Sequence, residues 1–111
     1  MGSVCYITAF YPKEHGLDIF LDTVSNIPMI ESRKESGLLV IGLKDLKEYM
    51  NHWYAPQDFV ALHPQLFSKL ESSEKDGAMV ALFNIRRGDR EAERAWNGLG
   101  LIPLLTIEIT D

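Results

Sequence analysis

The chain has 111 residues, of which 46% are hydrophobic and 24% are charged, and its formal net charge is −5 at pH 7. This size and composition are typical of one globular domain, residues 1–111, and they exclude an intrinsically disordered chain. An acidic chain also lacks the broad basic face through which proteins bind nucleic acid.

No segment of the sequence marks export or membrane insertion. The first nine residues carry no lysine or arginine, and the longest apolar run, 37–43, is far shorter than the roughly 20 residues that span a bilayer. A secreted domain of this size commonly relies on several disulfides, whereas this chain has one cysteine. We therefore expect a cytoplasmic protein without membrane contact, in which Cys5 is a small buried side chain.

The first third of the chain alternates strand and helix signals. Residues 4–11 are apolar on both alternating faces, as in an interior strand. A helix is expected over 17–24, where apolar side chains recur every three or four residues. We expect a hairpin to join a short strand at 29–32 to the apolar strand 38–41.

Helical spacing of apolar residues continues over 43–53 and over 59–70. Pro64 interrupts the second stretch, because its ring clashes with the preceding helical turn, so two short helices are expected there. The polar residues 72–77 are typical of an exposed loop, and the apolar residues 78–83 are typical of a buried strand.

The last quarter of the chain predicts one more helix and one more strand. Asp89 can cap a helix whose apolar side includes Trp96, and Gly98 or Gly100 can provide the left-handed residue at its end. Residues 101–109 then alternate apolar and polar side chains, which is typical of an edge strand with one face in water.

Together these elements predict an α+β fold, a single sheet of four to five strands covered by about four helices. Helical connections leave both parallel and antiparallel pairing open. The expected core side chains lie on the apolar side of their elements, and they are Phe20, Leu39, Ile41, Val80, Leu82, Trp96 and Ile107.

The sequence holds no pattern of a known catalytic or metal site. His15, His52 and His63 lack the i, i+4 spacing of paired zinc ligands, and no serine lies in a Gly-x-Ser-x-Gly elbow. We therefore expect no metal and no cofactor, and we favour a non-catalytic protein over an enzyme.

The first candidate site is the aromatic segment 49–59, in which five ring-bearing side chains crowd a helix end. Tyrosine and tryptophan provide large contact areas with a polar handle, so they are favoured at protein interfaces. Helical spacing takes Trp53 into the core. The predicted partner-binding residues are therefore Tyr49, His52, Tyr54 and Asp58.

The second candidate site is the turn 84–90, which holds three of the five arginines. A glycine-containing turn before a helix directs backbone N–H groups and the positive helix end toward an anion, and guanidinium groups add bidentate contacts. The predicted anion-binding residues are Arg86, Arg87 and Arg90.

Residues 84–104 resemble the closing helix and strand of the acetyltransferases that use acetyl-CoA. The matching positions are Asn84, Ala95, Gly100 and Leu101. This resemblance covers about a fifth of the chain, and the turn rich in Gly and Gln that binds the pyrophosphate in that family has no counterpart upstream. We therefore do not assign the family.

These observations predict a small acidic inhibitor or immunity-type protein, which neutralises a basic toxin or nuclease by direct protein–protein contact. Acidic surfaces steer and hold basic partners, and Asp45, Glu48 and Asp58 flank the aromatic segment. The alternative is a small-molecule enzyme or sensor of the acyl-CoA or nucleotide type, which would use the arginine-rich turn.

Overall fold

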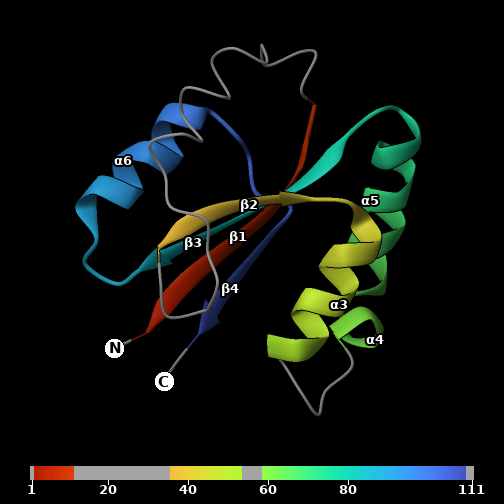
Figure 1. The fold of residues 1–111 in the computed structure, drawn as a ribbon, viewed down its shortest axis with the longest axis horizontal. Coiled ribbons are helices and arrows are strands. Elements are labelled where there is room, and N and C mark those ends of the chain that lie inside the picture. Colours follow the sequence, from red (N-terminus) through yellow and green to blue (C-terminus); the bar gives the residue numbers. More distant parts are fainter. Residues whose placement is uncertain (1, 12–35, 54–58, 110–111) are drawn as a thin grey trace.

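The computed structural model describes residues 2–11, 36–53 and 59–109 (Figure 1). The strands in these ranges are β1 (Ser3–Phe10), β2 (Gly37–Ile41), β3 (Met79–Arg86) and β4 (Leu105–Ile109). They form one sheet in the order β2-β3-β1-β4, and every pair is antiparallel. The helices are α3 (Leu43–Trp53), α4 (Phe59–Leu62), α5 (Pro64–Lys75) and α6 (Arg90–Leu99). The fold class is α+β, as the sequence indicates.

Helices lie on both faces of the sheet, with α3, α4 and α5 on one face and α6 on the other (Figure 1). The central strands β1 and β3 are therefore largely apolar on both faces, because helices cover both faces of the sheet. On the α3–α5 face one row of partners crosses the sheet, and it consists of Leu39, Leu82, Ile7 and Leu105.

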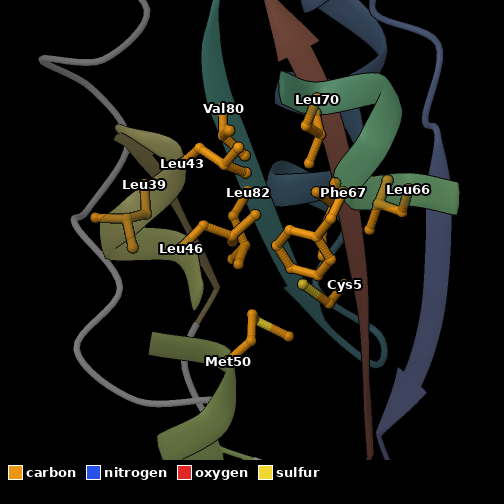
Figure 2. Close-up of a cluster of buried hydrophobic side chains, with 11 residues drawn as sticks. Cys5, Leu39, Leu43, Leu46, Met50, Leu66, Phe67, Leu70, Val80 and Leu82 are labelled. Carbon is orange, nitrogen blue, oxygen red and sulfur yellow. The ribbon is translucent and has the colours of Figure 1, made fainter. Parts of the chain in front are cut away.

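The larger core lies between this face and the helices α3 and α5. Figure 2 shows Phe67 of α5 near Cys5 and Leu82 of the sheet, and all three are buried. On α3, Leu46 and Met50 are fully buried, in agreement with the helical spacing of the sequence. A hydrogen bond also joins the two helices, because the Leu43 N–H at the start of α3 donates to the Glu74 carboxylate of α5.

The break predicted at Pro64 is confirmed, because α4 ends at Leu62 and α5 begins at the proline. A proline is tolerated at the first helical position, where its missing N–H would have no partner in the helix. The loop predicted at 72–77 is wrong in its first part, since α5 continues to Lys75. Residues 72–75 form the largely exposed last turn of a helix whose earlier turns bury Leu66, Phe67 and Leu70, so polarity alone does not end the helix.

The predicted strands at 4–11 and 38–41 agree with β1 and β2. The predicted strand 78–83 is too short, because β3 extends to Arg86. The predicted strand 101–109 is too long, because β4 begins at Leu105. Its alternation is confirmed, with Thr106 and Glu108 exposed on the edge strand of the described sheet.

Among the expected core residues, Leu39, Val80, Leu82 and Trp96 are buried. Ile41 and Ile107 are only half-buried, since β2 and β4 form the edges of the sheet within the described ranges. Phe20, the helix at 17–24 and the strand at 29–32 lie outside the described residues. In the described part of the chain, β2 pairs with β3.

The smaller core lies beneath α6. Trp96 packs there with Phe83 and Phe10, and Tyr6 contacts the same cluster. The capping prediction is confirmed, because the Asp89 side chain accepts a hydrogen bond from the Ala92 N–H at 3.1 Å. At the other end, Gly100 adopts the left-handed conformation with φ 65°, and its N–H donates to the Asn97 carbonyl.

Within the ranges that the structure covers, no helix combines the length and the apolar character needed to cross a membrane.

Candidate functional site

One cavity lies between the start of α5 and the start of β4, and we call it the α5–β4 cavity. Its volume is about 530 Å³, and its lining consists of residues 62–66, Lys69, Leu104 and Leu105. Four of these residues are leucines, and Lys69 is the one permanently charged residue among them. A cavity of this size falls in the range of roughly 300–1,000 Å³ that is typical of ligand pockets, and its leucines stand beside the polar side chains of His63, Gln65 and Lys69.

The break between helices α4 and α5 at His63 shapes one wall of this cavity. Leu62 follows the helical spacing of its neighbours, yet its side chain is 55% exposed because α4 ends there and α5 starts afresh at Pro64. Leu66, one turn further on, is buried against the sheet. The wall thus carries apolar side chains from the surface down to the core.

The segment before β4 forms the opposite wall, and β1 holds it in place. The Leu104 N–H donates to the Ile7 carbonyl at 2.8 Å, and the Thr8 hydroxyl donates to the Ile102 carbonyl at 2.7 Å. Thr8 is buried, so this hydrogen bond is shielded from water. These contacts fix the backbone from which Leu104 and Leu105 reach the cavity.

The outer edge of β4 adds backbone hydrogen-bonding groups to this region. In the part of the chain that the structure describes, β4 pairs with β1 alone. An edge strand directs the N–H and C=O groups of alternate residues away from its partner, where another extended chain can pair with them. The α5–β4 cavity therefore lies beside a strand edge that no other described strand covers.

Another cavity lies on the opposite face of the sheet, under α6, and we call it the Trp96 cavity. Its volume is about 310 Å³. The apolar part of its lining consists of Val4, Tyr6, Ile85 and Trp96, and the rest consists of Arg87, Gly88, Glu93 and Asn97.

The arginine-rich turn contributes to the Trp96 cavity through Arg87. Arg86, Arg87 and Arg90 are all exposed, but Arg86 and Arg90 do not line this cavity. The sequence placed Asn84 in the turn, and this is wrong, because Asn84 is fully buried within β3.

The backbone of the turn is already hydrogen-bonded. The Arg86 N–H donates to the Ser36 hydroxyl at 2.8 Å, and the Arg87 N–H donates to the Gly2 carbonyl at 2.9 Å. The carboxylate of Asp89 occupies the start of α6. Its pKa lies below the ordinary value, first because the Ala92 N–H donates to it and then because of a hydrogen bond with the Ser36 side chain. Any anion in this region would therefore meet the Arg87 side chain rather than a free helix end.

The structure brings together little of the predicted aromatic site. Tyr49 is half-buried and packs against the larger core. The side chain of His52, together with Tyr54 and Asp58, lies outside the described residues. The prediction that these four residues bind a partner stays a prediction.

Cys5 is fully buried in the larger core, as expected. Burial raises the pKa of its thiol to about 12, because the apolar surroundings disfavour the thiolate. The side chain therefore lacks the exposed thiolate that a nucleophile needs. Across the three described ranges, no three His, Cys, Asp or Glu side chains come close enough to hold a metal ion.

The turn 84–90 contained three of the residues that line the Trp96 cavity, Ile85, Arg87 and Gly88, and sequence reasoning assigned none of the other lining residues to a site. Glu93 and Asn97 stand four residues apart, so they share one side of a helix, and this spacing was a usable signal. For Leu62, Leu104 and Leu105 no local signal existed, because the segments that carry them meet only in the folded chain.

Comparison of the chain with known protein families, with curated proteins and with solved structures gave no match.

Proposed function

We propose that this protein is a non-catalytic binding protein, which holds an extended segment of a partner protein in the α5–β4 cavity. The observation that carries this proposal is the combination of four cavity-lining leucines with the edge of β4 that no other described strand covers. Burial of apolar side chains drives association, and hydrogen bonds to the backbone groups of β4 fix the orientation of the bound segment.

The apolar wall supports a protein segment as the occupant. Leu62 lines the cavity and its side chain is 55% exposed. Large exposed apolar side chains at a cavity are typical of interaction sites. Covering them with apolar side chains of a partner removes this surface from water, at roughly 25 cal/mol per Å².

The strand edge supports an extended conformation for that segment. Its backbone can pair with β4, and alternate side chains then point toward the side on which α5 lies. A helix could fill the cavity with apolar side chains, but it would leave the N–H and C=O groups of β4 without partners.

The net charge of the chain supports a finer proposal about the partner. At −5 the protein attracts a basic surface, as an inhibitor or immunity-type protein of a toxin or nuclease would. Asp45 and Glu48 lie exposed on α3 and can take part in this attraction. Lys69 is the charged residue of the α5–β4 cavity itself, so the acidic contacts belong outside it.

The experiment is affinity capture from the cytoplasm of the native cells, with the full chain as bait at low and at high salt. Three baits are compared, namely the wild-type chain, Leu62→Glu and Met79→Glu. Met79 is also exposed and apolar, but it lies beyond the opposite end of α5 and does not line the cavity. The two variants thus place the same carboxylate inside and outside the proposed site.

We expect the wild-type chain and Met79→Glu to retain one protein in equal amount, and Leu62→Glu to lose it. Loss of the same protein at high salt supports a basic partner, because salt screens exposed charges. Equal capture by all three baits would contradict a binding role for the cavity.

A further inference from the structure

We propose that the Trp96 cavity binds a free amino acid with an apolar side chain. This site lies on the opposite face of the sheet from the α5–β4 cavity. The proposal of an amino-acid ligand therefore does not depend on the proposal of a protein partner. The inference rests on charges of both signs around one apolar pocket.

Two opposite charges line this pocket without pairing. Arg87 approaches it from the turn after β3, and Glu93 approaches it from α6. Both side chains are exposed, and within the described part of the chain neither is in an ion pair. A guanidinium group is suited to a carboxylate, and a carboxylate is suited to an ammonium group. A free amino acid carries both complementary groups on one carbon atom.

The remaining walls select for an apolar side chain. Val4, Ile85 and the rings of Tyr6 and Trp96 form them, while Asn97 adds an amide that can donate or accept a hydrogen bond. A molecule whose charged end meets Arg87 and Glu93 can place its apolar end against these walls. A ligand with only one charge would leave the other protein charge unused.

The volume limits the ligand to a small molecule. At about 310 Å³ the cavity lies at the lower end of the range for ligand pockets, roughly 300–1,000 Å³. An amino acid such as leucine or phenylalanine suits this space better than a nucleotide or an acyl-CoA. The arginine-rich turn suggested a ligand of the acyl-CoA or nucleotide type. The small volume favours a ligand of the size of an amino acid instead.

Contacts within the fold hold the walls of the cavity in place. Tyr6 and Trp96 stack with ring centroids 4.6 Å apart, and Phe83 holds the indole from another side at 5.5 Å. The Arg87 backbone is fixed by its hydrogen bond to Gly2. Such preorganisation reduces the entropic cost of binding.

The test is an NMR titration of the ¹⁵N-labelled full chain, with the Trp96 indole N–H as reporter. Four probes are compared, namely L-leucine, L-phenylalanine, L-leucinamide, which lacks the carboxylate, and 4-methylpentanoate, which lacks the ammonium group. We expect saturable shifts with the two amino acids and binding weaker by about tenfold or more for each probe with one charge.

Paired variants locate the site. Arg87→Gln and Glu93→Gln should each weaken leucine binding by about tenfold or more. Arg90→Gln and Glu91→Gln remove the same charges from exposed positions that do not line the cavity, and they should leave leucine binding unchanged. Amide spectra of all four variants verify the fold.

Three results would each overturn the proposal. The first is the absence of a saturable shift with either amino acid at millimolar concentration. The second is equal binding of 4-methylpentanoate and leucine, which would indicate a site for simple anions. The third is an equal loss of leucine binding in the two control variants.

Discussion

Tyr6 of β1 and Trp96 of α6 stack face to face, with their ring planes inclined by only 7°. This contact joins the sheet to the helix that covers it, and it also forms part of the Trp96 cavity. Structure and proposed binding therefore depend on the same two rings.

The stack should be measurable as a coupling free energy. We expect a double-mutant cycle of Tyr6→Leu and Trp96→Leu, followed by urea unfolding, to give about 0.5–1.5 kcal/mol of coupling, since stacked aromatic pairs contribute this much beyond area burial. A cycle of Tyr6→Leu with Leu70→Ala, on the opposite face, is the control and should be additive. Additivity of the first cycle would contradict a stabilising stack.

The cap of α6 should make stability depend on pH in acid. The pKa of Asp89 is lowered in the folded chain, chiefly by the Ala92 N–H, so the ionised carboxylate stabilises the fold. This contribution is present above the unfolded pKa of about 3.9 and is lost as the pH falls through the lower folded value.

We expect Asp89→Ala to cost about 0.5–2 kcal/mol at pH 7, the usual range for loss of an N-cap. The difference from the wild-type chain should shrink as the pH falls below about 4. Urea unfolding of both proteins across this pH range measures the difference in their unfolding free energies. A difference that stays constant down to the lowest pH would show that the carboxylate charge is not involved.

A carboxylate from α5 caps the start of α3. Glu74 Oε2 accepts a hydrogen bond from the Leu43 N–H at 2.9 Å, which satisfies one of the N–H groups that a helix start leaves without a partner. We expect Glu74→Ala to cost about 1–2 kcal/mol of unfolding free energy.

Glu71 provides the matched control for this cap. It lies on the same helix and forms an ion pair with Lys47 at 3.5 Å, but both side chains are substantially exposed. Exposed ion pairs contribute about 0–1 kcal/mol, so Glu71→Ala should cost less than Glu74→Ala. The reverse order in chemical denaturation would contradict the capping role.

The thiol of Cys5 should react only when the chain unfolds. Its pKa of about 12 leaves almost no thiolate at neutral pH, and its side chain is fully buried. We expect iodoacetamide to label the native protein many times more slowly than the protein in concentrated urea. Fast labelling in native buffer would contradict the position of β1 in the core.

Local sequence signals predicted the elements whose cause is local. The spacing of Leu43, Leu46 and Met50 predicted α3, and Asp89 predicted the start of α6. Its end was narrowed to Gly98 or Gly100, and the structure places it at Gly100. Such signals depend on neighbours a few residues apart along the chain. These signals are therefore valid whichever distant contacts the element makes in the fold.

Features that depend on contacts between residues far apart in the chain could not be predicted from the sequence. Leu105 lines a cavity because it pairs with Ile7 across the sheet and faces Leu66 of α5 from the opposite wall. Neither neighbour can be inferred from spacing. The loop predicted at 72–77 was wrong in its first part for a related reason. Polar residues predict exposure, but they do not distinguish a loop from an exposed helical turn.

Site-specific photocross-linking tests the central claim, that the α5–β4 cavity holds a partner protein. Gln65 is exposed and lines this cavity, whereas Glu91 is exposed on α6 and lines neither cavity. A benzophenone amino acid is placed at each position in turn, and the full chain is irradiated in its native cells. We predict one dominant covalent adduct from position 65, absent from position 91 and suppressed when Leu62→Glu is added. An adduct from position 91 alone, or one from position 65 that persists with Leu62→Glu, would contradict the account.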